Sequence, residues 1–373
     1  MKAFHFLFLA LFVLSFSCQS RQSKSTQNTY QTKPDTSTSP SDTSYILPGE
    51  THFQSLRKLT DGGNNAEAYF SFSDTLAVFQ SDYTGWNVSC DQIFYTDLRD
   101  DDLVQNQPPL ISTGRGRTTC SYFLPGDSTI VYASTHLQMD SCPPVPSKEK
   151  GYVWPIYPAY DIFVADLQGR ILDTLTTHPG YDAEPTVSPD GEKIVFTSTR
   201  SGDLELWTMN LDGSNKKQVT DQLGYDGGAF FSPDSKRLVF RASRPESKEA
   251  RATYRKLLDS NLVKPTAMEV FVVDVDGSNL RQVTDLGQAN WAPFFHPSGE
   301  KIIFSSNHES RRGYPFHLYL INVDGTGLKP VTNSRTFDAF PMFSFSGDKL
   351  LFSSNRANGG GRATNLFLAE WKE

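Results

Sequence analysis

The sequence predicts an all-β fold, a six-bladed β-propeller made of four-stranded antiparallel blades. The first observation is a repeat: similar phrases occur as YDAEPTVSPDGEKIVFTSTR (181–200), YDGGAFFSPDSKRLVFRASR (225–244) and FDAFPMFSFSGDKLLFSSNR (337–356). The second is composition: 13% of the 373 residues are aromatic, which gives enough apolar mass for a large folded domain. Such a repeat indicates a repeat architecture, in which neighbouring units cover one another's apolar faces.

Each unit begins with two strands around a tight turn. The turn carries Pro, Ser, Asp or Gly and the flanking segments are apolar, which is typical of a β-hairpin. The six hairpins are expected at residues 69–82, 122–136, 186–200, 230–244, 294–308 and 342–356. A third strand is expected after each of them, at residues 92–98, 161–167, 205–211, 269–275, 317–323 and 365–371.

A fourth strand follows in most units after a Gly-containing turn, as in GSNKKQVT (213–220). The sixth unit lacks this strand, because only Lys372 and Glu373 follow its third strand. The phrase LRKLT (56–60) has the pattern of a fourth strand but stands before the first unit. We expect it to complete the last blade, which closes the ring and removes an exposed sheet edge.

The first residues have the pattern of a targeting segment. Lys2 precedes the apolar run from Phe4 to Phe16, which is short for a membrane-spanning helix and predicts a signal peptide over residues 1–17. Ser17 directly before Cys18 resembles the processing site of a bacterial lipoprotein, so we expect Cys18 to carry lipid. A plain secretory signal with an incidental cysteine is the alternative, and both interpretations export the protein.

Residues 18–50 are dominated by Ser, Thr, Gln and Pro, and this composition predicts a disordered tether between Cys18 and a propeller at 51–373. No acidic cluster follows Cys18, which favours a periplasmic protein anchored to the outer membrane over surface display. The formal charge is −7 and no basic stripe is found, so a nucleic-acid partner is not expected. We expect a monomer.

The repeats resemble those of a known family. SPDG followed by KIVFTSTR and DGSNKKQVT resemble the repeats of the TolB-type propeller, a WD-repeat-like family of bacterial periplasmic proteins, and the resemblance covers residues 51–373. It implies a six-bladed propeller in the cell envelope. TolB has an α/β domain before its propeller, whereas the tether occupies that place here. Some pectin-degrading lyases also resemble this architecture and use metal-bound histidines.

Catalytic signatures are absent from the sequence. It contains no G-x-S-x-G, H-E-x-x-H, C-x-x-C or phosphate-binding loop, and the 7 histidines form no cluster with metal-ligand spacing. We therefore expect no cofactor, no metal and a function other than catalysis. An enzyme remains an alternative, because a propeller can assemble a site from several blades.

One mouth of the central channel is expected to carry a ring of charged and polar side chains. Loops that enter the first strand and loops that leave the second strand of each blade lie at the same end of the ring. The residues at these positions are Glu67, Asp82, His136, Asp182, Glu184, Arg200, Asp226, Arg244, Asn290, His308, Asp338 and Arg356.

Two interpretations of this ring are open. The arginines Arg200, Arg244 and Arg356 pair with neighbouring carboxylates and join the blades, or the ring holds a ligand or an ion. His136 and His308 occupy equivalent positions in blades two and five, so a pair of metal ligands across the channel is a further alternative.

Two insertions break the repeat between second and third strands, and both are expected at the same mouth. Residues 137–160 are Pro-rich and aromatic, and residues 245–268 contain a short amphipathic helix. Inserted loops on one face of a repeat ring are a usual place for binding, although these aromatic side chains have the alternative of packing onto the blades. The expected partner-binding residues are Tyr152, Trp154, Tyr157, Tyr160, Arg251, Tyr254 and Arg255.

Three cysteines remain besides Cys18, and an exported protein meets an oxidising compartment, so one disulfide is expected. Cys90, Cys120 and Cys142 are all expected near the same mouth, so distance does not choose among the pairings. We favour Cys90–Cys120, which would join adjacent blades.

These observations lead to a functional interpretation. We expect an exported lipoprotein whose propeller binds an envelope protein or an anionic glycan, because the helical insertion brings basic residues to the mouth. An enzyme acting on a sugar polymer and a structural envelope scaffold are the alternatives. Carboxylates without protein partners around an open cavity would favour an enzyme or an ion site, whereas a ring closed by Arg–carboxylate pairs would favour a scaffold.

Overall fold

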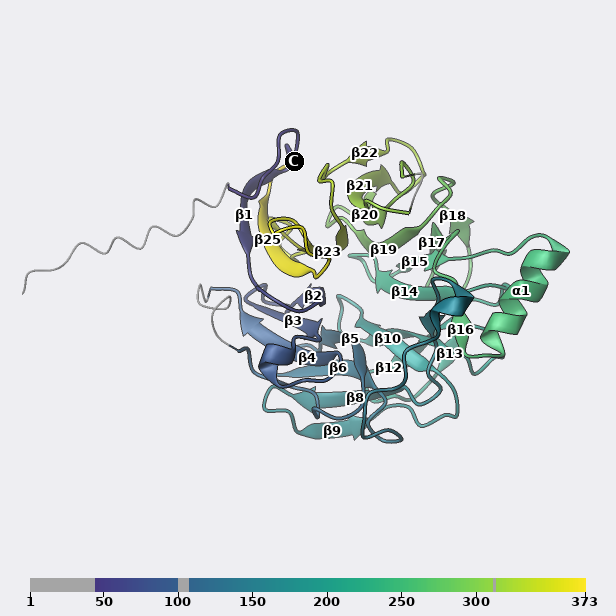
Figure 1. Ribbon diagram of the computed structural model, residues 1–373. Coiled ribbons are helices and arrows are strands. Elements are labelled where there is room, and N and C mark those ends of the chain that lie inside the picture. Colours follow the sequence, from purple (N-terminus) through teal and green to yellow (C-terminus); the bar gives the residue numbers. More distant parts are fainter. Residues whose placement is uncertain (1–43, 100–106, 311–312) are drawn as a thin grey trace, which may run out of the picture. The chain divides into compact units, whose positions relative to one another are not determined.

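A computed structural model describes residues 44–99, 107–310 and 313–373. Within these residues the chain forms six antiparallel blades in a ring (Figure 1). The expected all-β, six-bladed propeller is confirmed. The expectations for residues 1–43, which include the signal peptide, Cys18 and most of the tether, lie outside the described residues.

Blades one to three follow the predicted order of strands. Blade one contains β2 (Asn65–Phe70), β3 (Leu76–Ser81) and β4 (Gln92–Asp97). Blade two contains β5 (Thr118–Phe123), β6 (Thr129–Ser134), β8 (Asp161–Asp166) and β9 (Ile171–Thr174). Blade three contains β10 (Asp182–Val187), β11 (Lys193–Ser198), β12 (Glu205–Asn210) and β13 (Lys217–Gln218). Instead of a fourth strand, blade one has an isolated bridge between Phe94 and Leu110.

Blades four to six complete the ring. Blade four contains β14 (Asp226–Phe231), β15 (Arg237–Ala242), β17 (Glu269–Asp274) and β18 (Arg281–Gln282). Blade five contains β19 (Asn290–Phe295), β20 (Lys301–Ser306), β21 (His317–Asn322) and β22 (Lys329–Pro330). Blade six contains β23 (Asp338–Phe343), β24 (Lys349–Ser354), β25 (Asn365–Trp371) and β1 (Phe53–Lys58).

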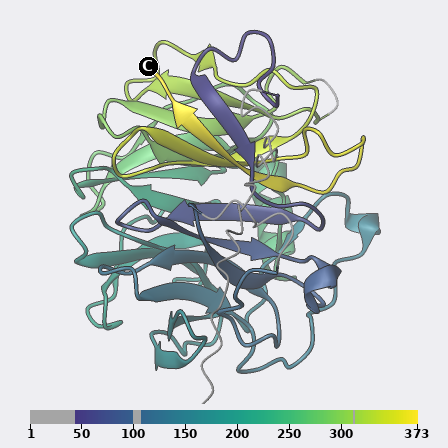
Figure 2. The same cartoon turned by 90° about the vertical axis from the view of Figure 1, so that its left-hand side faces the viewer.

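The N-terminal strand closes the ring as the sequence predicts. β1 pairs antiparallel with β25, with Phe53 opposite Trp371 and Lys58 opposite Phe367. Figure 2 shows β1, in purple, beside the yellow C-terminal strand. Residues from both ends of the described chain therefore share one sheet, and β25 has no free edge.

The predicted tether of residues 18–50 ends earlier than expected. The Tyr45 ring packs edge-on against Phe367, with 5.6 Å between ring centroids. Glu50 is buried and pairs with Arg356 at 3.0 Å. Because these contacts attach residues 44–50 to blade six, the propeller begins before residue 51.

The core lies between the faces of neighbouring blades. The fourth residue of every second strand is a buried aromatic: Phe79, Tyr132, Phe196, Phe240, Phe304 and Phe352. Burying such a ring stabilises the fold by about 1.5–3 kcal/mol. Each blade is covered on both faces, so its second strands are buried along nearly their whole length rather than on alternate residues.

The two insertions pair with each other. β7 (Trp154–Pro155) in the first insertion and β16 (Leu262–Val263) in the second form a two-stranded antiparallel sheet. The predicted helix is α1 (Lys248–Leu258), which is capped by Ser247 and lies beside β16 (Figure 1). In the part of the chain that the structure describes, no helix is long and apolar enough to span a bilayer.

Candidate functional site

The channel wall is built from the first strand of each blade. First strands contact the first strands of neighbouring blades, so they surround the ring axis. Each of them contains a bulge, where the strand register shifts against the second strand. The third residue of each first strand has a φ between 45° and 60°: Glu67, Cys120, Glu184, Gly228, Ala292 and Phe340.

Aromatic side chains fill the channel below the bulges. Tyr69 of blade one and Phe230 of blade four face each other across the axis, with 5.4 Å between ring centroids. Phe294 packs on Phe230 at 5.1 Å, and Tyr122 packs on Tyr69 at 5.8 Å. The channel is therefore closed, and the mouth above the bulges ends in a blind pocket.

This pocket, which we call the mouth pocket, has a volume of about 330 Å³. Its floor comes from bulge residues and its walls from the blades and the first insertion. The residues used below are Glu67, Asp91, Arg117, Tyr152, Trp154, Tyr157, Tyr160, Tyr181, Glu184, Tyr225, Arg241, Trp291 and Phe340. Aromatic residues of the first insertion thus line the same pocket as the acidic ring residues Glu67 and Glu184.

A buried ion pair joins blades three and four in the pocket. The Arg241 guanidinium pairs with the Glu184 carboxylate and donates to the Tyr225 hydroxyl at 2.7 Å. Glu184 also accepts from the Thr197 hydroxyl at 2.7 Å and from the Gly228 backbone N–H at 2.9 Å. These additional hydrogen bonds are what a buried ion pair requires to offset its desolvation.

Two glycines make room for this ion pair. A Cβ at Gly228, which has a φ of +60°, would overlap with the Arg241 guanidinium. A Cβ at Gly227 would lie 2.5 Å from Glu184 Oε2. The Gly-Gly of β14 is therefore the local sequence feature that accommodates a charged residue at the fifth position of β15.

Glu67 is the ionisable group of the pocket without an ion-pair partner among the described residues. It comes from the bulge of β2, and its buried Oε2 atom has no hydrogen-bond partner in the described part of the chain. Burial raises the pKa of Glu67 to about 7, although a hydrogen bond with Cys120 and the charge of Arg241 act in the opposite direction. The carboxyl group thus titrates closer to neutral pH than an ordinary glutamate.

A second ion pair lies on the other wall. Arg117 Nη1 is 3.4 Å from Asp91 Oδ2. Burial raises the pKa of Asp91, and Arg117 opposes this shift. The guanidinium and the carboxylate therefore neutralise each other at the pocket wall.

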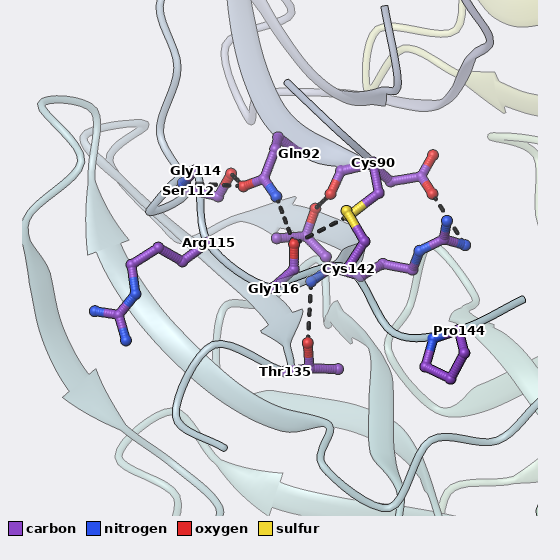
Figure 3. Close-up of a disulfide and its surroundings, with 12 residues drawn as sticks. Cys90, Gln92, Ser112, Gly114, Arg115, Gly116, Thr135, Cys142 and Pro144 are labelled. Atoms are coloured by element: carbon purple, nitrogen blue, oxygen red, sulfur yellow. Dashed lines mark hydrogen bonds and ion pairs between the residues drawn. A yellow bond between two sulfur atoms is a disulfide. The ribbon is translucent and has the colours of Figure 1, made fainter. Parts of the chain in front are cut away.

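The first insertion is fixed over the pocket at several points. A disulfide joins Cys90 to Cys142, with 6.0 Å between their Cα atoms, and Figure 3 shows it beside Gly116. The Tyr157 hydroxyl donates to the Pro144 carbonyl at 2.8 Å, and the Trp154 indole lies 5.2 Å from that of Trp291. Together with the β7–β16 pairing, these contacts hold the aromatic wall in one position.

The predicted pairing Cys90–Cys120 is wrong. Cys120 is a buried free thiol at the bulge of β5, where its backbone N–H donates to the Gln80 side chain at 3.1 Å. Its side chain hydrogen-bonds to Glu67 at the pocket floor. Cys90 instead meets Cys142 because the insertion folds back over the loop before β4.

The three predicted arginines pair within their own blades rather than between blades. Each lies two residues after the second strand, opposite the first residue of the first strand. The pairs are Arg200–Asp182 at 2.7 Å, Arg244–Asp226 at 3.0 Å and Arg356–Asp338 at 3.1 Å. Each guanidinium also lies over aromatic rings of the same blade. In this part of the predicted ring, the arginine charges are therefore neutralised by aspartates of the same blade.

The two ring histidines have the same arrangement. His136 Nδ1 is 2.9 Å from the Ser134 hydroxyl, and His308 Nδ1 is 3.0 Å from the Ser306 hydroxyl. Burial lowers the pKa of both histidines. Among the described residues, no group of three or more His, Cys, Asp or Glu side chains has the geometry of a metal site.

The remaining predicted residues lie outside the mouth pocket. Asn290 donates to Glu269 at 2.9 Å, and Asp82 accepts from the Asn64 backbone N–H at 2.7 Å. Arg251 and Arg255 are exposed on α1, and the Tyr254 hydroxyl donates to Asp203. The second insertion therefore supports the pocket only through the pairing of β16 with β7, and its predicted binding residues do not line the pocket.

Several pocket residues were not predicted from the sequence. Arg241, Tyr225, Tyr181 and Trp291 line the pocket, and Tyr181 and Tyr225 each stand directly before a first strand. One sequence feature could have indicated Tyr225 and Arg241. The phrase YDGG (225–228) is followed by an arginine near the end of the next strand, and the other repeats lack both the Gly-Gly and this arginine.

The sequence is similar to known proteins over short regions. Residues 158–257 match the family model of the TolB beta propeller domain. TolB of the Tol-Pal system from Bordetella pertussis is 43% identical over 47 residues, which are 13% of this chain and 11% of that protein. An uncharacterized protein from Agrobacterium fabrum is 36% identical over 56 residues, or 15% of this chain and 19% of that protein. The matches thus span less than a fifth of either relative.

Solved structures share the fold over most of the chain. A putative TolB from Agrobacterium tumefaciens has a TM-score of 0.54 at 16% identity, covering 83% of this chain and 91% of that chain. An oligogalacturonate lyase from Vibrio parahaemolyticus has a TM-score of 0.52 at 13% identity, covering 84% and 79%. These likenesses concern the fold, and they confirm the resemblance to TolB-type propellers.

Proposed function

We propose that this TolB-like propeller is a non-enzymatic binding protein of the bacterial cell envelope, which captures a partner in the mouth pocket. The observation that carries the proposal is the closed channel with a fixed aromatic wall above it. Tyr152, Trp154 and Tyr157 line a pocket whose far end is filled by the aromatic rings of the first strands. Aromatic side chains with polar tips provide much contact area at low entropic cost.

The wall is ordered before any partner arrives. The disulfide, the β7–β16 sheet and the Tyr157–Pro144 hydrogen bond restrict the insertion at separate points. A surface that needs no ordering on binding retains more of its contact energy as affinity. This arrangement supports binding over a purely structural role, for which such a fixed open pocket has no use.

The partner we propose is a segment of an envelope protein, with a glycan as the second class. The pocket has the size of a side chain, a chain terminus or a sugar unit, and not of a folded domain. We place the protein in the periplasm, attached to the outer membrane through Cys18. The basis for this location is the amino-acid pattern of residues 1–18 and the likeness to TolB.

Capture from envelope extracts tests the binding function. The variant Trp154→Ala/Tyr157→Ala should lose most of the captured partner, because it removes two rings from the pocket wall. The control Ile171→Ala/Leu172→Ala removes two exposed apolar side chains from β9 of the same blade. Mass spectrometry of the captured material and thermal unfolding of both variants are measured. A folded pocket variant that still captures the same partner would place the binding surface elsewhere.

Membrane fractionation tests the anchor. Cys18→Ala should move the protein from the membrane fraction to the soluble periplasmic fraction, because the single lipidated cysteine is proposed as the whole anchor. Unchanged fractionation, or a mature N-terminus without lipid by mass spectrometry, would contradict the lipoprotein assignment.

The second candidate function is an enzyme acting on a sugar polymer. The observation that favours it is Glu67, whose pKa of about 7 is suited to proton transfer near neutral pH, in a pocket that also contains Arg241 and Tyr225. Incubation with oligogalacturonate and measurement of ultraviolet absorbance from unsaturated products tests a lyase reaction. Turnover that disappears in Glu67→Gln would replace the binding proposal with a catalytic one.

A further inference from the structure

We infer that the mouth pocket binds a primary ammonium group, which is seated between the Glu67 carboxylate and the surrounding aromatic rings. This inference rests on the proposed binding function and names the chemistry of the ligand. Two sources supply the same chemistry, namely the N-terminus of a peptide and a lysine side chain. Both present a compact cation on a short stem.

The charges of the pocket leave one carboxylate unmatched. Arg241 pairs with Glu184, and Arg117 pairs with Asp91 at 3.4 Å. Glu67 is the fifth charged group, so three acids face two guanidinium groups. An ionised Glu67 gives the pocket a net negative charge, which a bound cation would neutralise.

The geometry of Glu67 supports this role. The bulge in β2, with a φ of 53° at Glu67, places the side chain at the pocket floor. Its Oε2 atom is buried without a hydrogen-bond partner among the described residues. A buried carboxylate oxygen without a donor is costly, because it has lost its hydration. Glu67 as a whole is partly exposed and lines the pocket, so an ammonium group, which has three donors, would pair with its carboxylate from the pocket side.

The walls complete a site for a cation. Trp154, Tyr152 and Trp291 line the pocket together with Tyr181 and Phe340. The faces of such rings attract cations, most strongly when water is excluded. Arg241 already lies over the Trp154 ring, with its guanidinium carbon 5.2 Å from the ring centroid. This contact shows that the aromatic wall accommodates positive charge.

An anion fits the same pocket poorly. It would meet Glu67, Glu184 and Asp91, while the guanidinium groups of Arg241 and Arg117 are already occupied by carboxylates. The basic residues that suggested an acidic ligand, Arg251 and Arg255, lie on exposed α1 and do not line the pocket. The volume of about 330 Å³ corresponds to roughly ten waters, which is enough for a short aliphatic or peptidic stem.

Binding should depend on pH with a defined sign. The groups that act on Glu67 are Cys120 of β5, Glu184 of β10, Arg241 of β15 and Asp91 before β4. Since the pKa of Glu67 is about 7, an ammonium ligand must bind the ionised form and release the proton. Affinity should therefore fall as the pH drops below 7, by about tenfold per pH unit well below the pKa.

The test uses small probes on the whole folded protein. Alanine amide presents an N-terminal ammonium, and Nα-acetyl-lysine amide presents a side-chain ammonium; comparing the two distinguishes the sources. Butyrate and N-acetyl-alanine amide are the anionic and neutral controls. Binding is followed at pH 8 by calorimetry and by intrinsic tryptophan fluorescence, to which Trp154 and Trp291 of the pocket contribute. We expect an ammonium probe to bind at least tenfold more tightly than either control.

Glu67→Gln is the matching variant, because it keeps the shape of the side chain and removes the charge. It should weaken ammonium binding at least tenfold and abolish the pH dependence. Glu192→Gln, an exposed residue in the β10–β11 turn, should change neither. If Glu67→Gln fails to fold, the affinity of the wild-type protein for the ammonium probes is measured between pH 6 and 8. An affinity that rises with pH supports the inference, and an affinity that does not change with pH overturns it.

Failure of this inference is separable from failure of the proposed function. If Trp154→Ala/Tyr157→Ala loses the partner while Glu67→Gln and ammonium competitors have no effect, the pocket binds a partner and the ammonium assignment is overturned. Equal affinity for butyrate and for the ammonium probes would also overturn the ammonium assignment. If no probe binds and the aromatic double variant still captures its partner, both proposals are overturned.

Discussion

Arg241 occupies a position where the other second strands carry uncharged residues. These are Gln80, Ala133, Thr197, Ser305 and Ser353. Arg241 is 8% exposed and pairs with Glu184 of the neighbouring blade. Like Arg117 with Asp91, it is therefore a charged contact that joins two blades at the mouth, a role that the sequence assigns to the ring arginines.

Replacing Arg241 alone should be strongly destabilising. Arg241→Met leaves Glu184 buried without its positive partner, and breaking a buried ion pair in this way costs about 3–5 kcal/mol of unfolding free energy. Glu184→Gln combined with Arg241→Met should recover part of the loss, because no unpaired charge remains. Chemical denaturation measures both variants. Wild-type stability of Arg241→Met would show that Glu184 does not depend on this partner.

The start of a third strand lies beside the start of the first strand of the next blade, and carboxyl side chains from the two strands face each other there. Glu205 at the start of β12 faces Asp226 at the start of β14, and it accepts from the Thr220 hydroxyl at 2.6 Å. Burial, together with the charge of Asp226, raises the pKa of Glu205 to about 8, while the Thr220 hydrogen bond and Arg244 oppose the shift. Asp161 has the same position in blade two, and burial raises its pKa to about 6.

These raised pKa values predict a loss of stability with rising pH. A carboxyl group whose pKa is higher in the folded state favours folding below its unfolded pKa of about 4.5, and this contribution is lost as the pH rises through the folded pKa of about 8. Glu205→Gln should therefore stabilise the protein by ~1–2 kcal/mol at pH 8 and flatten its stability between pH 5 and 8. Thermal unfolding against pH, with Glu192→Gln as the control, checks this. An unchanged pH profile would contradict the raised pKa.

The disulfide attaches the first insertion to the loop before β4. Cys90 and Cys142 are 52 residues apart, and closing a loop of that length restricts the unfolded chain by about 4 kcal/mol in the chain-entropy treatment. Cys142→Ser should lower the unfolding free energy by up to that amount and weaken ligand binding, because the aromatic wall loses one attachment. Ile171→Ala, in an exposed strand of the same blade, should leave binding intact. Peptide mapping without reductant should recover the Cys90–Cys142 linkage, and recovery of Cys90–Cys120 would contradict the structure.

At the scale of the whole molecule, stability depends on closing the ring. Deleting residues 51–61 removes β1 and exposes the edge of β25, which should lower the melting temperature and promote aggregation. A variant that starts at residue 44 is the matched control, since it keeps β1. Equal melting temperatures for the two truncated proteins would show that β1 does not close the ring.

Most of the fold could be predicted, because its signals are local. Turn residues and apolar strands identified the hairpins, and LRKLT before the first unit indicated the closing strand. The partners of individual side chains could not be predicted in the same way. Cys142 meets Cys90, and Arg241 meets Glu184, only after residues from different units come together in space. The Gly-Gly before Arg241 was the one sequence feature that pointed to the second contact.

The pairing of β7 with β16 has a consequence for how the binding surface can change during evolution. Leu262 lies opposite Pro155 and Val263 opposite Trp154, and the Ile156 backbone N–H donates to the Asn261 carbonyl at 2.8 Å. These are main-chain contacts, so they impose few demands on the side chains that project from the two segments. Substitutions at the pocket-facing positions can therefore alter ligand preference while the supporting frame persists. Related propellers with the same paired insertions would then recognise different partners on an unchanged scaffold.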